Sequence, residues 1–192
     1  MIRNQTHITN MRLEIPDANT TMNFVNAAQS VNIPSLEMEI SRVSINQMAS
    51  GNLPGSKINY EPLRVRFLID EDFKSYQEIY QWMISVTDSR TFDSTAHLPG
   101  ARPRTMLVHI LDNSKRNILM TFKFNDPFPS TIDEIEMSYV DSGNPAITGM
   151  VSFHYATMSL LDKNGNEILP LKTKVGTGTG SNGGLALHPS LR

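Results

Sequence analysis

Three consecutive carboxylates, Asp70, Glu71 and Asp72, are the first residues whose types could do chemistry. Neighbouring carboxylates can hold a hard cation or act as a general acid and base. Their spacing does not match a calcium-binding loop, however, and no complementary histidine accompanies them. They stand between a strand pattern and a helix pattern, where a carboxylate accepts the free backbone N–H groups of the first helical turn. We therefore predict that the triplet caps a helix.

The five histidines lack the spacing of a helical metal pair. His109 and His154 lie on strand patterns and could approach each other across a sheet, where we expect a solvated or hydrogen-bonded pair rather than a metal site. There is no cysteine, which excludes thiolate metal sites, disulfides and thiol nucleophiles. The serines form no Gly-x-Ser-x-Gly elbow. The other histidines are His7, His97 and His188.

The glycine-rich run from Gly176 to Gly184 is similar to a loop that cradles phosphate. Such loops need a helix directly after them to supply N–H donors. Only residues 185–192 follow here, and they include Pro189. A segment of this composition cannot bury enough apolar surface to fold by itself. We predict that residues 173–192 form an arm attached to a domain spanning residues 1–172.

Composition and charge are ordinary for a globular domain: 17 Lys plus Arg stand against 19 Asp plus Glu, and 39% of residues are hydrophobic. This balance does not favour a general affinity for nucleic acid or anionic membranes. Six basic residues could form a patch, although a solvated strand face and loop charges explain them better: Arg64, Arg66, Arg102, Arg104, Lys115 and Arg116. No apolar run is long enough to cross a bilayer, and no signal peptide is evident. We expect no enzyme activity, cofactor, metal or membrane association.

The stretch from Tyr60 to Val86 is the clearest structural unit. Residues 60–69 alternate apolar and polar side chains, as in a strand with one buried face. Residues 72–86 then place apolar side chains at spacings of three and four, which predicts a helix packed through one face. That face contains Phe73, Tyr76, Tyr80 and Met83, and it leaves Trp82 outside as a possible contact residue.

Alternating patterns predict further strands at residues 7–15, 22–33, 36–40 and 147–161, a hairpin of 106–111 with 118–124, and a short strand at 168–171. Residues 46–59 and 87–103 are predicted as long loops. Runs of strands around a single helix indicate a mainly β protein, an antiparallel β-sandwich or barrel with one flanking α-helix.

The loop at residues 46–59 is unusually long between two strands and is partly apolar, and long loops are often functional. We expect it to contact a neighbouring subunit or ring. The arm ends in alternating leucines that could dock on a neighbour. The candidate subunit-interface residues are Met48, Asn52, Leu53, Lys57, Trp82, Leu185 and Leu187.

Several segments together resemble one family. They are Ala28–Ser35 (AQSVNIPS), Leu53–Phe73 (LPGSKINYEPLRVRFLIDEDF) and Tyr76–Met83 (YQEIYQWM), followed by Phe128–Ile132 and Ser138–Gly143. In this order they resemble tail-tube-fold proteins of T-even-type contractile bacteriophages, and most of all the tail completion and sheath-stabiliser proteins. The resemblance covers about residues 22–161.

The resemblance implies a structural virion protein, assembled in the host cytoplasm, that forms a homohexameric ring. Strands of six subunits would close a barrel around a lumen for DNA, which passes without sequence-specific binding. The implied partners are tail tube, sheath and neck or baseplate proteins, and no catalytic residue carries over. The ring would complete the tube at its end. The alternatives are the major tube subunit, a tube initiator at the baseplate, and a carbohydrate-binding module using Tyr80 and Trp82, with a hydrolase ranked last.

Overall fold

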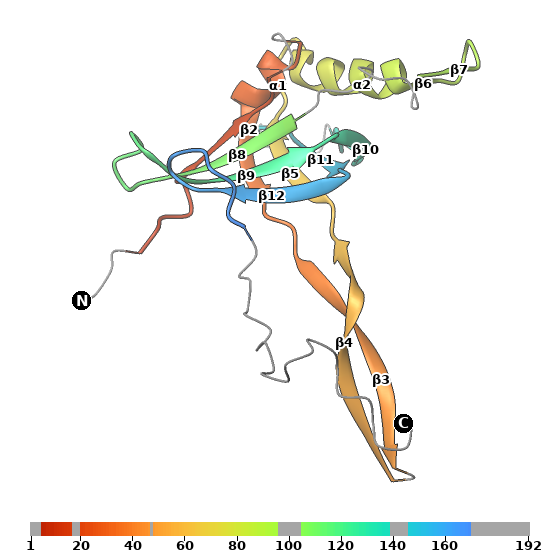
Figure 1. Cartoon of the computed structure of the whole chain (residues 1–192). Helices are drawn as coiled ribbons and strands as arrows, with labels where there is room; N and C mark the ends of the chain where they lie inside the picture. The colour runs from red at the N-terminus through yellow and green to blue at the C-terminus, as the bar shows by residue number, and fades with distance from the viewer. Residues whose placement is uncertain (1–4, 17–19, 47, 96–104, 139–145, 170–192) are drawn as a thin grey trace.

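The computed structural model describes residues 5–16, 20–46, 48–95, 105–138 and 146–169. Two four-stranded antiparallel sheets form its body, and Figure 1 shows two helices at one end and a long hairpin projecting from the opposite end. One sheet has the order β1 (Met11–Glu14), β8 (Thr105–Leu111), β9 (Ile118–Asn125), β12 (Thr157–Leu161). The other has the order β10 (Phe128–Ile132), β11 (Thr148–His154), β5 (Leu63–Leu68), β2 (Ala28–Asn32).

The remaining elements join or leave this body. The helices are α1 (Met22–Ala27) and α2 (Lys74–Val86). Strands β3 (Leu36–Asn46) and β4 (Ala49–Tyr60) pair only with each other within the described residues, as do the two-residue strands β6 (Thr87–Asp88) and β7 (Asp93–Ser94). The mainly β, antiparallel fold is confirmed.

The core lies between the facing sheets because their strands alternate buried and exposed residues. Leu63, Val65 and Phe67 of β5 are fully buried, while the intervening Arg64 and Arg66 are exposed. β11 is antiparallel to β5 in the same sheet and also buries alternate residues. The predicted strand is thus confirmed over Leu63–Leu68, although Tyr60 belongs to β4 because Pro62 has no N–H to continue a ladder. From the opposite sheet the core receives Leu13, Met106, Val108 and Phe124.

Asp70 confirms the predicted cap of α2. Its carboxylate accepts the backbone N–H of Lys74 at 3.2 Å and of Ser75 at 3.0 Å, together with the Ser75 hydroxyl at 2.8 Å. The bonds to Ser75 are the main reason that the pKa of Asp70 lies below its usual value. Asp72 instead forms an ion pair with Lys74 at 2.9 Å.

The buried face of α2 differs from the prediction. Ser75, Ile79 and Trp82 are buried, whereas Tyr80 is 49% exposed. Trp82 is only 7% exposed and packs against Phe153, with the ring centroids 5.5 Å apart. The small Ser75 can occupy the buried stripe because its hydroxyl also donates to the carbonyl of Leu68.

Helix α1 replaces the first part of the strand expected at residues 22–33, so the described part of the chain has two helices where one was predicted. The carboxylate of Glu78 in α2 accepts the backbone N–H groups of Asn23 at 3.2 Å and Phe24 at 2.8 Å. It thereby satisfies donors at the amino end of α1 where the N-cap residue Thr21 makes no side-chain capping hydrogen bond. The helix depends on a residue more than fifty positions away.

The strand expected at residues 147–161 is also two strands, β11 and β12, which belong to different sheets. The chain turns at Tyr155 and Ala156, and the Ala156 N–H donates to the carbonyl of Asn125. The turn at residues 162–166 is confirmed. Of the strand expected at 168–171, residues 168 and 169 are not in a strand and the other two lie outside the described residues, while Glu167 forms an isolated bridge with Leu161. Strand β10 lies outside the predicted strands, and it is an edge strand with a register shift beside Pro129.

The hairpin of β8 and β9 is confirmed, and its turn predicts a pH dependence of stability. The Asp112 carboxylate accepts bonds from the side chains of Ser114 and Asn117, both at 2.8 Å, which lower its pKa from 3.8 to about 2. The ionised group therefore stabilises the fold above its unfolded pKa, and this contribution is lost as the pH falls from 3.8 to about 2. Urea unfolding of the wild type and Asp112→Asn should show a stability difference that shrinks across this interval. A difference independent of pH would contradict the assignment.

Candidate assembly interface

Residues 46–59 are not a loop, contrary to the prediction. Residues 49–60 form β4, which pairs with β3 along almost its whole length. Between the pairs Met38–Ile58 and Ile40–Pro54, three residues of β4 stand opposite Glu39 alone. The backbone is so close there that a Cβ on Gly55 would lie 2.3 Å from the Glu39 carbonyl oxygen. Only glycine fits this position. Because Gly55 fits there, β4 continues through the bulge as one strand although its pairing with β3 shifts register.

The hairpin presents an apolar face to solvent. Residues paired across an antiparallel ladder share a face, so Leu36 with Tyr60 and Met38 with Ile58 lie together, followed by Ile40 with Pro54. We call Leu36, Met38, Ile40, Ile58 and Tyr60 the hairpin apolar face; these side chains are between 37% and 63% exposed. A contiguous exposed apolar surface of this kind is typical of a protein–protein interface.

The base of the hairpin is fixed to the body. The ring of Tyr155 packs edge to face on Tyr60 at 5.9 Å and on Phe124 at 4.8 Å. Its hydroxyl donates to the backbone carbonyl of Glu61 at 2.9 Å. Burial, together with the neighbouring Tyr60 and Glu61 side chains, raises the pKa of Tyr155 to about 12, so the donor is protonated at physiological pH. The hairpin therefore leaves the sandwich in a defined direction (Figure 1).

Four of the predicted interface residues lie on this hairpin. Met48 is in its turn and is 99% exposed, and Leu53 is 54% exposed on the face opposite the hairpin apolar face. Asn52 pairs with Arg42, and Lys57 lies at the bulge. Trp82 is a core residue and not a surface contact in the subunit, which corrects that prediction. Leu185 and Leu187 lie outside the described residues.

Sequence reasoning missed the hairpin apolar face itself. The alternation of Leu36, Met38 and Ile40 with polar residues predicts a strand with one polar face, as in an antiparallel sheet open to water on one side, and it does not predict that the apolar face is exposed as well. The available signal was a second apolar series at the same period, Ile58 and Tyr60, which begins at the end of the presumed loop.

Both sheets also have open edges. Within the described ranges, β2 and β10 pair on one side only, as do β1 and β12. Open edges carry unpaired backbone donors and acceptors, which favour pairing with another chain. The sheet of β10, β11, β5 and β2 therefore offers one free edge at each side.

The predicted pairing of His109 with His154 does not form, because β8 and β11 belong to different sheets. His109 bridges Thr121 at 2.8 Å and Glu14 at 3.2 Å, and His154 stacks on Phe128. Threonine, histidine and glutamate in a row have the order of a nucleophile, a base and an acid. Thr121 is only 5% exposed, however, so substrate cannot reach it, and the row serves to join β1, β8 and β9.

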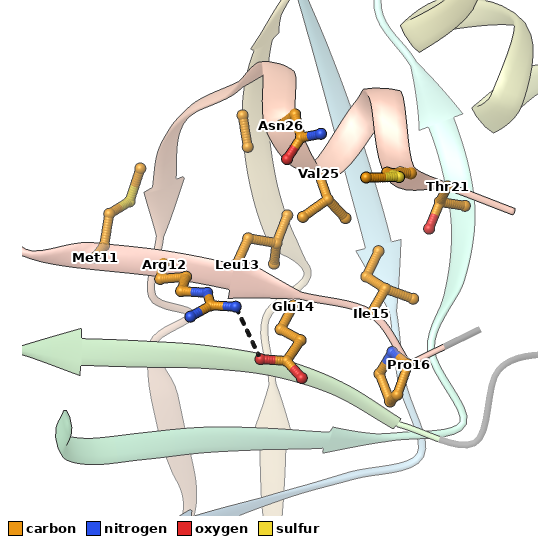
Figure 2. Close-up of a pocket in the computed structure, with 11 residues that line it drawn as sticks. Met11, Arg12, Leu13, Glu14, Ile15, Pro16, Thr21, Val25 and Asn26 are labelled. Atoms are coloured by element: carbon orange, nitrogen blue, oxygen red, sulfur yellow. Dashed lines mark ion pairs between the residues drawn. The ribbon is translucent and has the colours of Figure 1, made fainter. Parts of the chain in front are cut away.

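A hollow of about 500 Å³ lies between β1 and α1. Figure 2 shows Leu13, Ile15 and Val25 directed into it, and the ion pair of Arg12 with Glu14, 3.8 Å long, at its border. The charged residues that line this hollow thus pair with each other, which is more typical of a structural hollow than of a catalytic or ligand-binding site. In the part of the chain that the structure describes, no three His, Asp or Glu side chains gather as metal ligands, and neither helix is long and apolar enough to span a membrane.

Two antiparallel sheets, a flanking helix and a projecting hairpin define the tail-tube class of fold. Among solved structures, the cap that terminates the tube of the anti-feeding prophage superposes with a TM-score of 0.57 at 6% identity, covering 84% of this chain and 94% of that one. The sheath/tube terminator of the PVC extracellular contractile injection system, in its extended state, also gives 0.57, at 10% identity and with 83% and 99% coverage.

Sequence comparison gives the family. The phage tail tube protein family model matches residues 4–160. The chain is 36% identical over 169 residues to the tail tube terminator protein of Enterobacteria phage T4, which covers 87% of this chain and 94% of that protein. The chain therefore belongs to the phage tail tube protein family, and it is a structural component of a phage tail.

Proposed function

We propose that this protein terminates the tail tube of a contractile phage as a homohexameric ring, completing the tube and stabilising the sheath around a DNA channel. The observation that carries the proposal is the 36% identity to a tail tube terminator over 94% of that protein's length. The fold similarity to the terminators of two other contractile systems is consistent with it.

The sheet edges provide a route to ring closure. If β2 of one subunit pairs with β10 of the next, the same contact repeats around the ring. Such a head-to-tail contact closes when the rotation between neighbours divides a full turn. Six four-stranded sheets would then form one barrel without open edges, and DNA would pass through it without sequence-specific binding.

The hairpin provides the second contact. Its apolar face projects beyond the sandwich, where it would be covered by a neighbouring subunit, an adjacent tube ring or the sheath. Met48, Asn52, Leu53 and Lys57 would extend this contact to the turn and the second face. The arm from Thr173, with Leu185 and Leu187, would add a tethered apolar end that distinguishes the terminal ring from the rings below it.

Copy number in the virion tests the proposal against the major tube subunit and a baseplate initiator. Quantitative mass spectrometry should give about one hexamer per tail, and cryo-electron microscopy should place it at the head-proximal end of the tube. Dozens of stacked hexamers would identify the main tube subunit instead. A single ring at the baseplate would identify an initiator.

A further inference from the structure

The outward face of the β10–β11–β5–β2 sheet differs in charge from the rest of the chain. These four strands contain two arginines, one histidine and no aspartate or glutamate, although the whole chain has a net charge of -2. Arg64 and Arg66 alternate with the buried residues of β5 and are both exposed on the outward face. Residues two apart on a strand are about 6.7 Å apart along it, so the two cations form a short row.

Polar groups surround this row. In register, Arg64 lies between Asn32 of β2 and Ser152 of β11, and Arg66 lies between Ser30 and Met150. A shallow hollow of about 380 Å³ beside Arg64 is lined by Ser130, Ser152 and His154, with Asp133 as its one carboxylate. No ion pair to Arg64 or Arg66 occurs among the described residues. Both guanidinium groups are therefore free to bind an external anion.

We infer that this sheet face, centred on Arg64 and Arg66, contacts the phosphates of duplex DNA. The inference rests on the proposed function, because a ring closed through β2 and β10 would repeat the arginine pair around its circumference. Guanidinium groups bind phosphate strongly without reading sequence. Hydroxyl and amide groups of the kind beside them also donate to phosphate oxygens. Because the net charge of the whole chain is -2, attraction to DNA has to come from a local basic face such as this one.

Binding of a labelled short DNA duplex to assembled rings tests the inference, with fluorescence anisotropy measured from about 50 to 200 mM salt. Electron microscopy first confirms that each variant forms rings. Wild-type affinity should fall steeply with salt. Arg64→Gln with Arg66→Gln should bind at least tenfold more weakly and show a shallower salt dependence. Arg64→Lys with Arg66→Lys, which retains the charges, should bind nearly as well as the wild type.

Lys115→Gln with Arg116→Gln is the matched control, because it removes two charges from the β8–β9 turn, which belongs to the other sheet. It should bind DNA within twofold of the wild type. Equal weakening by the control and the Arg64/Arg66 variant would overturn the inference, as would unchanged binding by that variant. Absence of wild-type DNA binding despite intact rings would refute the inference alone, whereas absence of rings in the wild type would refute the proposed function.

If the variant with both Arg64→Gln and Arg66→Gln does not form rings, DNA binding is measured with Arg66→Gln alone. It should give an intermediate affinity and salt slope. An affinity equal to that of the wild type would count against the inference. Tighter binding of an acidic protein than of duplex DNA would assign this face to a protein partner instead.

Discussion

Replacing Met38 and Ile58 together by aspartate is expected to abolish assembly while leaving the subunit folded. The two side chains are paired across β3 and β4 on the hairpin apolar face, and each is 50% exposed. Because the two side chains contribute little to the core, the free energy of unfolding of the subunit should change by about 0.5 kcal/mol or less. In an assembled tail each carboxylate would lie in an apolar interface without a partner, which costs several kcal/mol. Circular dichroism would check the fold, and electron microscopy would check ring and tail formation.

The opposite face of the hairpin supplies the control. Asn59→Asp adds a carboxylate beside Glu37 on that face, away from Leu53, and Met38→Asp alone is its matched single-charge comparison. We expect the Asn59 variant to assemble, because its new carboxylate stays on the polar part of that face. Normal assembly of the Met38/Ile58 variant would exclude the hairpin apolar face as an interface, and loss of assembly in both variants would show that the hairpin tolerates no added charge.

Phe153→Ala is expected to destabilise the subunit by about 3–5 kcal/mol, the usual cost of removing a buried phenylalanine. Phe153 is fully buried in β11, and its ring contacts Trp82 of α2 at 5.5 Å and Phe24 of α1 at 5.9 Å. The substitution therefore leaves a cavity where both helices meet the sheet. Equilibrium unfolding in urea would give the loss directly. Phe73 is less suitable for this experiment because it is only half-buried.

Phe92→Ala removes the same ring from a site that is 94% exposed, so it should change stability by less than about 0.5 kcal/mol. A loss below 1 kcal/mol for Phe153→Ala, or equal losses for the two variants, would contradict the described packing of the helices on the sheet. Near-ultraviolet circular dichroism should also change in Phe153→Ala, because the environment of Trp82 depends on that ring.

The sequence alone determined the elements whose signals are local. β5 and the β8–β9 hairpin were predictable because alternate residues must face the core of a two-layer protein. The start of α2 was predictable because Asp70 caps it from a few residues away. The tail-tube family was also recognisable from short motifs in β2, β4, β5 and α2. The alternation of Ile58 and Tyr60 was too short to predict a strand through the presumed loop at 46–59, because Gly51, Pro54 and Gly55 are typical of turns.

Only the tertiary structure decided the features that depend on distant partners. α1 is capped by Glu78, and β4 is a strand because Gly55 lets its backbone meet Glu39. Trp82 is buried because α2 meets β11 and Phe153 on a side that the helix's own periodicity does not specify. The stretch from residue 147 to 161 divides into two strands because its second half, β12, pairs with β9 in the other sheet. In each case a contact between residues far apart in the chain outweighs local propensity, since packing and hydrogen bonding depend on distance in space.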